Sequence, residues 1–210
     1  MEKRTVRGVA VLGVVCLLGL GGPRGLAPGV AAQSQKQEPN NGWAYVNCDK
    51  GPSGALQRAI DRATSGQTIH VSGTCYENVT IPAGKDLLTL DGGGEATIDG
   101  PDDTANTILV RGPRGVTITR LTITGGRVGI DVSRGSSALI DSNTIEGTGR
   151  NGIILGAFST ANIVNKTIQN NPVNGILVTG NAFGFIAFAP PTTRSRVPTV
   201  FGTMASTESM

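Results

Sequence analysis

Five charged side chains in the middle of the chain could form a surface that binds a polar ligand. Arg120, Arg127 and Arg134 supply guanidinium groups, and Asp131 and Asp141 supply carboxylates. Guanidinium and carboxylate groups form strong, oriented hydrogen bonds with polar ligands. The sequence therefore predicts a ligand-binding patch at these residues. The competing interpretation is a set of surface salt bridges, each contributing less than about 1 kcal/mol to stability.

Candidates for acid–base catalysis are weaker. Glycoside hydrolysis uses two carboxyl groups, and Asp102 and Asp103 are adjacent, but a Gly-Pro-Asp-Asp-Thr segment is typical of a solvated turn. Asp91 begins an Asp-Gly-Gly-Gly run that lacks the nonapeptide repetition of calcium-binding loops. The sole histidine, His70, lies between two apolar residues, and we expect it to be structural. We therefore assign no catalytic residue and predict no metal or other cofactor.

The charge distribution argues against a nucleic-acid partner. The net charge of +3 comes entirely from residues 1–32, because 14 basic and 14 acidic side chains balance in residues 33–210. Binding to nucleic acid relies on clustered Lys and Arg, and a neutral remainder offers no such attraction.

The first 32 residues are typical of a secretory signal peptide. A basic stub (1–7) precedes an apolar run (8–22), and Val30-Ala31-Ala32 provides small residues for cleavage near Ala32. The alternative, a membrane anchor, needs about 20 apolar residues, more than this run holds. We expect a mature chain without a transmembrane span, either secreted or located in the periplasm or cell envelope.

The cysteines agree with export. Cys16 leaves with the signal peptide, so Cys48 and Cys75 remain as an even pair in an oxidising compartment. This arrangement predicts a disulfide. The alternative, two metal-binding thiolates, lacks a CxxC partner and a nearby histidine cluster.

A repeat of 22–23 residues organises residues 46–187. Gly-Ile segments recur at 129, 152 and 175, and short β-branched runs recur at the same step, separated by Gly, Asn, Ser or Thr. A repeat of this length indicates a solenoid, and three short strands per turn leave no room for amphipathic helices. The predicted fold is all-β, a single-stranded right-handed parallel β-helix. Its predicted inward columns are Ile108, Ile130, Ile153 and Ile176; Ile118, Ile140, Ile163 and Ile186; and Ile123, Ile145 and Ile168.

Two further positions repeat with the same step. Thr122, Thr144 and Thr167 are expected to line an outward face. Asn151 and Asn174 precede glycine at equivalent turns and could form a two-rung hydrogen-bonded ladder. The alternative is that Asn-Gly only suits a turn with positive φ.

The ends of the solenoid are expected to differ. Residues 53–65 predict a short capping helix at the N-terminal end, with Ser53 as its N-cap and Gly66 at its end. Residues 33–45 are expected to form a linker. Pro190 and Pro191 should stop the sheet, so residues 188–210 form an irregular tail that either covers the open end or belongs to a truncated or frame-shifted copy of a longer solenoid.

On these residues the chain resembles exported bacterial proteins of the pectin-lyase-like superfamily, built of parallel β-helix repeats. Residues 48–81, with Gly-Thr-Cys-Tyr-Glu-Asn-Val-Thr-Ile at their end, look like the first coil of that superfamily, and the Gly-Ile-x-Val and Asn-Thr-Ile elements look like its repeats. The resemblance covers roughly residues 46–187. It implies the fold more than an activity, because the superfamily includes lyases, hydrolases, epimerases and non-enzymatic surface proteins.

The signatures of the family enzymes are incomplete. The Trp-x-Asp-His motif of pectate lyases is absent, and Arg111-Gly112-Pro113-Arg114 is followed by Val116 where the final arginine of Arg-x-Pro-x-x-Arg would stand. The glycine neighbours that polygalacturonases place around their histidine are missing at His70. We therefore expect a polysaccharide-binding or surface scaffold module rather than an enzyme. The alternatives are a polysaccharide lyase or glycoside hydrolase, with calcium entering only under the lyase alternative, and a periplasmic NosD-like accessory protein.

Overall fold

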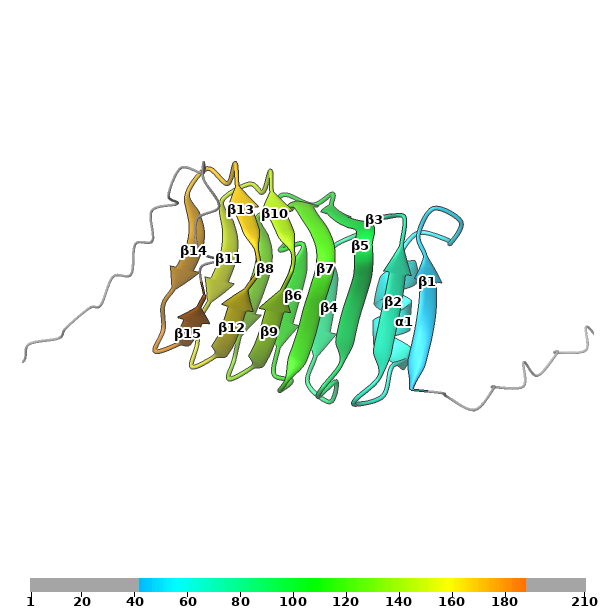
Figure 1. Ribbon diagram of the computed structural model, residues 1–210, viewed down its shortest axis with the longest axis horizontal. Helices are drawn as coiled ribbons and strands as arrows, with labels where there is room; N and C mark the ends of the chain where they lie inside the picture. The colour runs from blue at the N-terminus through cyan, green and yellow to red at the C-terminus, as the bar shows by residue number, and fades with distance from the viewer. Residues whose placement is uncertain (1–41, 188–210) are drawn as a thin grey trace, which may run out of the picture. The chain divides into compact units, whose positions relative to one another are not determined.

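The computed structural model describes residues 42–187, which form a solenoid of short parallel strands with one helix (Figure 1). The predicted parallel β-helix is therefore confirmed. The expected signal peptide and C-terminal tail lie outside the described residues. In the described part, no helix is long and apolar enough to cross a bilayer.

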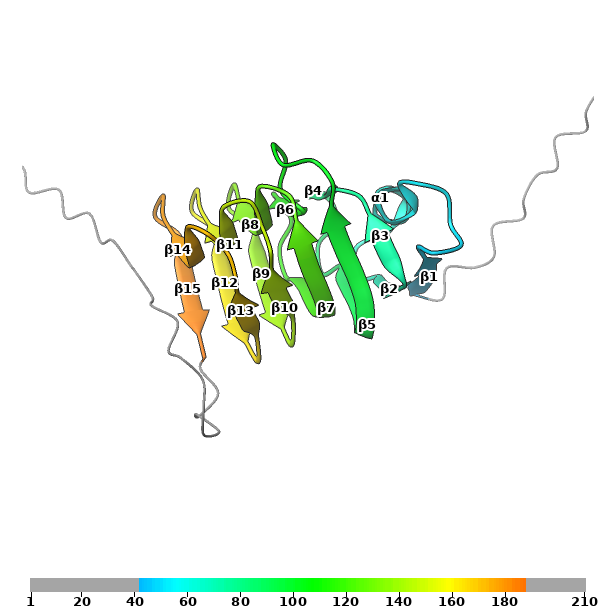
Figure 2. The same cartoon turned by 90° about the horizontal axis from the view of Figure 1, so that it is seen from above.

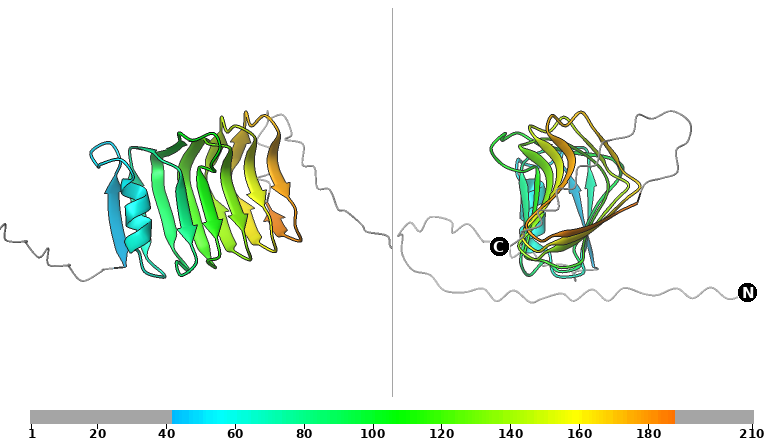
Figure 3. Two further views of the ribbon diagram at one scale, coloured as in Figure 1. Left: turned by 180° about the vertical axis from the view of Figure 1, so that it is seen from behind. Right: turned by 90° about the vertical axis from the view of Figure 1, so that its left-hand side faces the viewer.

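Two parallel sheets form the walls. Within residues 42–187, sheet A has ten strands, and its main path runs β1-β2-β5-β7-β9-β12-β15, with β3, β10 and β13 paired beside it. In the same range, sheet B has five strands in the order β14-β11-β8-β6-β4. The elements are β1 (Trp43–Asn47), α1 (Ala55–Arg62), β2 (Thr68–Ser72), β3 (Thr74–Tyr76), β4 (Val79–Pro82), β5 (Thr89–Gly100), β6 (Ile108–Arg111), β7 (Val116–Gly125), β8 (Val128–Ser133), β9 (Ser137–Asp141), β10 (Thr144–Glu146), β11 (Asn151–Leu155), β12 (Thr160–Val164), β13 (Thr167–Gln169), β14 (Asn174–Val178) and β15 (Phe183–Ile186). Viewed along the solenoid axis, successive coils superimpose (Figure 3).

The predicted inward columns are all present. The strand register pairs Ile108 with Ile130 and continues through Ile153 to Ile176. The other two isoleucine columns follow the same rule in sheet A. Because a strand alternates its side chains between two faces, the residues between these isoleucines project outward, as predicted for the threonine column at 122, 144 and 167.

The Gly-Ile motif has a steric cause at the start of the sheet B strands. A Cβ on Gly152 would lie 2.7 Å from the carbonyl oxygen of Gly175 and 2.8 Å from Cγ2 of Ile168. A Cβ on Gly129 would likewise lie 2.7 Å from the carbonyl oxygen of Gly152 and 2.7 Å from Cγ2 of Ile145. Glycine at this position therefore lets β8 and β11 pack directly on the isoleucine column of sheet A.

Sheet A bends midway along each coil. Arg120, Ser142 and Asn165 occupy equivalent bend positions with φ of 56°, 57° and 46°. Beside this bend, buried Asn143 donates from Nδ2 to the carbonyl of Ile118 (2.8 Å) and accepts from the amide of Leu121 (3.0 Å). Its side chain thus satisfies backbone groups that the bend removes from the strand ladder.

The predicted asparagine ladder is also present. Nδ2 of Asn174 donates to Oδ1 of Asn151 at 2.9 Å, linking equivalent turns of successive coils.

The helix differs from its predicted bounds. It spans Ala55–Arg62, and Gly54 rather than Ser53 occupies the N-cap position without a side-chain hydrogen bond. Capping instead comes from the next coil, because the Glu77 carboxylate accepts hydrogen bonds from the amides of Leu56 (3.0 Å) and Gln57 (2.9 Å). The C-cap is Ala63 rather than Gly66, because Ala63 already has extended backbone geometry.

The helix covers the N-terminal end of sheet B. In the first coil α1 stands where later coils place a sheet B strand, next to β4 (Figure 1). Leu56 and Ile60 are buried on its inner face. The side-chain amide of Gln57 pairs with the edge of β4, donating to the carbonyl of Thr80 (3.0 Å) and accepting from its amide (2.7 Å). The predicted capping role is therefore achieved partly by a side chain that imitates a neighbouring strand.

Candidate functional site

The five sequence-predicted binding residues do not form one patch. Asp131 lies on β8 in sheet B, and Arg127 immediately precedes that strand. Arg120 and Asp141 lie in sheet A, on β7 and β9. Arg134 is exposed in the turn between β8 and β9, with φ of 58°. The structure therefore brings together Arg127 with Asp131, and places Arg120 and Asp141 on a different wall.

Asp131 has the most unusual environment of these residues. It stands outward in sheet B between Leu109 and Ile154. Nδ2 of Asn106, in the turn before β6, donates to its Oδ2 at 2.8 Å. Its Oδ1 is buried and has no hydrogen-bond partner among the described residues. A partly buried carboxylate with one unsatisfied oxygen is costly to keep.

Burial raises the pKa of the Asp131 carboxyl above its ordinary value. The side-chain hydrogen bonds from Asn106 and Ser133 and the positive charges of Arg127 and Arg111 act in the opposite direction without reversing the shift. Perturbed carboxyl groups of this kind are enriched at functional sites, which makes Asp131 the best candidate on sheet B.

Two hollows flank the turn between β5 and β6, which projects beyond the neighbouring turns (Figure 2). The smaller, about 350 Å³, includes Asn106 and Leu109, the hydrogen-bond partner and the strand neighbour of Asp131. The larger, about 590 Å³, extends over the turns that precede β8 and β11. Arg127 and Thr104 line both hollows.

The larger hollow carries two arginines one coil apart. Arg127 and Arg150 hold equivalent positions in successive turns, and those turns are joined by a hydrogen bond from the amide of Gly149 to the carbonyl of Gly126 (2.7 Å). Adjacent parallel strands lie about 4.8 Å apart, so the two exposed guanidinium groups project along one wall at the coil spacing. We call this pair of hollows, lined by Arg127, Arg150 and Asn106 and adjoining Asp131, the sheet B groove.

The adjacent carboxyl groups of Asp102 and Asp103 have separate surroundings. Asp102 accepts hydrogen bonds from the hydroxyl (2.6 Å) and the amide (2.8 Å) of Thr104, which lower the pKa of its carboxyl. Asp103 instead lines the larger hollow. Asp102 is thus used to shape its own turn, as expected of a turn acid.

Sheet A holds an ionic cluster that sequence reasoning missed. Arg120 donates from Nε to Oδ1 of Asp91 (2.9 Å) and from a terminal nitrogen to its Oδ2. Nδ1 of His70 lies 3.4 Å from the same Oδ2. The three residues come from three successive coils, and the Asp91–Arg120 pair spans an irregularity in register between Asp91 and Ala96.

Asp91 stays ionised because of these partners. Burial alone would raise the pKa of its carboxyl, but the amide of Gly93, the hydrogen bonds and charge of Arg120 and the charge of His70 together lower it. The calcium-loop resemblance of Asp91 therefore corresponds in the structure to an arginine-paired carboxylate. Asp141, two coils further along the same wall, accepts from Asn165 (2.9 Å) and from Ser142 (3.0 Å).

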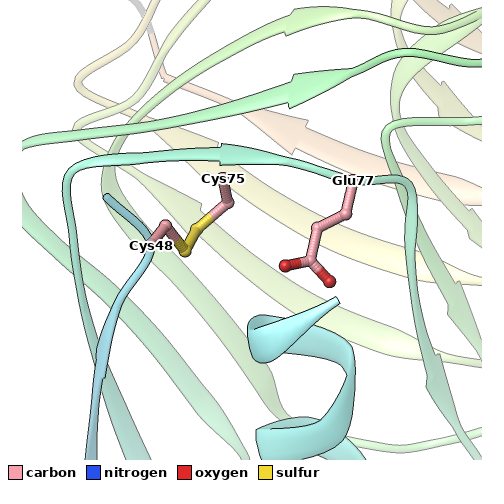
Figure 4. Close-up of side chains that lie close together, drawn as sticks. All are labelled: Cys48, Cys75 and Glu77. Carbon is pink, nitrogen blue, oxygen red and sulfur yellow. A yellow bond between two sulfur atoms is a disulfide. The ribbon is translucent and has the colours of Figure 1, made fainter. Parts of the chain in front are cut away.

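The cysteine pair forms the predicted disulfide, with Cα atoms 4.9 Å apart. Ligand-type atoms of Cys48, Cys75 and Glu77 lie within 4.8 Å of one another (Figure 4). The two sulfur atoms are bonded to each other and the carboxylate of Glu77 caps α1. These contacts already use the donor atoms that a metal ion would need, so this cluster is structural.

Comparison with known proteins agrees with this architecture. A search of curated protein sequences found no match. Among solved structures, the chain is similar to an alginate lyase from Paenibacillus sp. str. FPU-7, with 18% sequence identity and a TM-score of 0.43. The superposition covers 66% of each chain, so this chain spans just under two thirds of that protein's length. The family described as the right handed beta helix region matches residues 67–189, more than half of the chain. The protein therefore belongs to the right-handed β-helix family.

Proposed function

We propose that this protein is an exported β-helix module that binds a polysaccharide along the sheet B groove. The observation that carries the proposal is the environment of Asp131, a partly buried carboxylate that accepts a hydrogen bond from Asn106 and adjoins a groove lined by Asn106 and arginine. A protein retains such a group at a cost in stability when the group serves a ligand.

The solenoid suits a polymer as the ligand. Equivalent turns repeat Arg127 as Arg150 one coil further on, so donors recur at a regular spacing parallel to the solenoid axis. A repeating ligand that runs along the axis can meet one guanidinium per coil. Guanidinium groups pair well with carboxylates, which favours an acidic polysaccharide among the candidates.

Export is supported by the disulfide, because such bonds persist in oxidising compartments outside the cytoplasm. The signal-peptide pattern of residues 1–32 points the same way.

One observation favours an enzyme as the second candidate. A carboxyl group whose pKa is raised can act as a general acid, and Asp131 has this property beside Arg127. A lyase or hydrolase acting in the same groove is therefore the alternative function.

Affinity electrophoresis tests both candidates. The purified protein is run through native gels that contain pectate, alginate, xylan or a neutral glucan, and its migration is compared with that in a polymer-free gel. Retardation in at least one gel without loss of polymer supports the binding module and identifies its ligand class. Unretarded migration in all four gels would contradict the binding module. A zone of cleared polymer would show that the protein degrades the polymer and would support the enzyme instead.

A further inference from the structure

The aromatic side chains of residues 42–187 lie outside the core. The largest fully buried side chains in the described range are all leucine or isoleucine. The only tryptophan of the chain, Trp43, is 54% exposed, and Tyr45 is 70% exposed. Aromatic residues normally supply a large share of core burial, so their placement on the surface here calls for a role other than packing.

Trp43 and Tyr45 lie on one face of one strand. They are two residues apart on β1, so both project from the outer face of sheet A about 6.6 Å apart. The register places Trp43 beside Thr68 and Tyr45 beside His70 on β2. The rings of Tyr45 and His70 lie 5.9 Å apart between centroids and are tilted by 34°. We call these four residues the aromatic platform; β1 is the first strand of sheet A, at one end of the solenoid in Figure 1.

A polar cluster borders the platform. Asp91 stands next to His70 in the following coil, and Arg120 holds its carboxylate through two hydrogen bonds. The guanidinium side chain remains 53% exposed. Apolar ring faces therefore adjoin hydrogen-bonding groups that are fixed in orientation, which is the composition of a site that binds a ligand with one apolar face and a polar rim.

We propose that the aromatic platform is a second glycan-binding site, for neutral sugars in pyranose form. The C–H face of a pyranose ring packs on Trp43 and Tyr45, and its hydroxyl groups reach Thr68, His70 and the exposed edge of Arg120. The proposal adds a site on sheet A to the proposed polysaccharide-binding function, and it does not require the sheet B groove to bind.

The charge at the platform selects the ligand. The cation of Arg120 is already paired with Asp91, so the platform offers a carboxylated sugar no unpaired arginine. This distinguishes it from the sheet B groove, where Arg127 and Arg150 line a hollow. A neutral glucan fits the platform, whereas an oligouronate fits the groove.

The sole tryptophan makes the test direct. The full-length protein is titrated with cellohexaose and, separately, with an oligouronate of equal length, while the emission of Trp43 is recorded. We expect a saturable change in emission with cellohexaose and none with the oligouronate. The emission of Arg127→Gln should respond as the unaltered protein does, because that residue lies in the sheet B groove. A flat titration with cellohexaose, or a change with the oligouronate alone, would overturn the proposal.

Variants separate stacking from mere exposure. Tyr45→Ala should raise the Kd for cellohexaose about tenfold, the loss expected for one stacked ring. Tyr76→Ala is the matched control, because Tyr76 is equally exposed at 68% but projects from β3, beyond the bend; its Kd should be unchanged. An equal effect of both variants would contradict the assignment. Retardation of the protein in a gel that contains an acidic polymer reports on the sheet B groove alone. The fluorescence titration with cellohexaose reports on the aromatic platform, so failure of one site can be told apart from failure of the other.

Discussion

Replacing Asp131 by leucine should stabilise the fold at neutral pH and abolish binding in the sheet B groove. The strand neighbours of Asp131 on the outer face of sheet B are Leu109 and Ile154, both half-buried. A leucine would continue this apolar column. The substitution also removes the carboxylate whose Oδ1 is buried without a hydrogen-bond partner in the described chain.

The magnitude follows from three contributions. An unsatisfied buried acceptor costs about 1–3 kcal/mol, and the lost hydrogen bond from Asn106 to a charged group was worth about 1.5–3 kcal/mol. Half-burial of a leucine side chain adds about 1 kcal/mol. The expected net gain for Asp131→Leu at pH 7 is about 1 kcal/mol, which corresponds to a rise of about 2–4 °C in Tm.

The gain should depend on pH in a defined direction. The pKa of Asp131 is raised above its ordinary value of 3.8 in the folded protein. As the pH rises through 3.8 the unfolded chain therefore releases this proton before the folded chain does, and the folded protein loses stability. The advantage of Asp131→Leu should accordingly grow from pH 3 towards pH 7 and level off once the folded pKa has been passed.

Urea unfolding of both proteins at pH 3, 5 and 7 measures this difference, and affinity electrophoresis measures binding. Using the difference between the two proteins cancels the titration of the other carboxyl groups. A variant that is less stable than the unaltered protein at pH 7, with a difference independent of pH, would refute our account of Asp131. It would show instead that the carboxylate is a structural partner of Asn106.

Three further predictions concern the framework. Replacing Cys48 and Cys75 by serine opens a loop of 27 residues and should lower the free energy of unfolding by about 3–4 kcal/mol. Urea unfolding measures this loss, and a loss below about 1 kcal/mol would contradict the prediction. Gly152→Ala should lower the free energy of unfolding by about 1–3 kcal/mol through overpacking. Gly156→Ala should lower it less, because the new Cβ would meet its nearest neighbour at 3.9 Å. Equal losses in Tm for the two variants would refute the steric argument. Gln57→Ala should speed hydrogen exchange at the edge of β4, because two hydrogen bonds are lost there, and unchanged exchange rates would argue against the edge-capping role.

The sequence repeat predicted most of the fold because the packing of side chains repeats from coil to coil. Each inward isoleucine stacks on the isoleucine 22 or 23 residues away, so the step in the sequence is also the step in space. The Asn151–Asn174 ladder was predictable for the same reason. The disulfide followed from the even count of cysteines that remain after the expected signal peptide.

Contacts that break the period escaped prediction. Asn143 fills the bend of sheet A, but its equivalents in adjacent coils are Leu121 and Lys166, so no repeated asparagine marks the position. The Asp91–Arg120 pair spans 29 residues rather than 22 or 23, because extra residues enter both β5 after Asp91 and the turn between β5 and β6. No fixed step in the sequence could have connected those two side chains.

The capping of α1 failed as a prediction for a related reason. Local rules select Ser53 because a serine commonly caps the residues that follow it. In this fold the next coil passes directly above the helix start, and Glu77 supplies a carboxylate from 21 residues away. A rule based on neighbouring residues in the sequence cannot identify a partner that comes into contact only when the solenoid folds.

The most direct test of the proposed function compares two arginines in one gel. Arg127→Gln and Arg134→Gln each remove one exposed guanidinium, but only Arg127 lines the sheet B groove. In the acidic polymer that retards the unaltered protein, pectate or alginate, we expect Arg127→Gln to migrate nearly as in a polymer-free gel and Arg134→Gln to remain retarded. Equal retardation of both variants, or equal loss in both, would contradict binding in the sheet B groove.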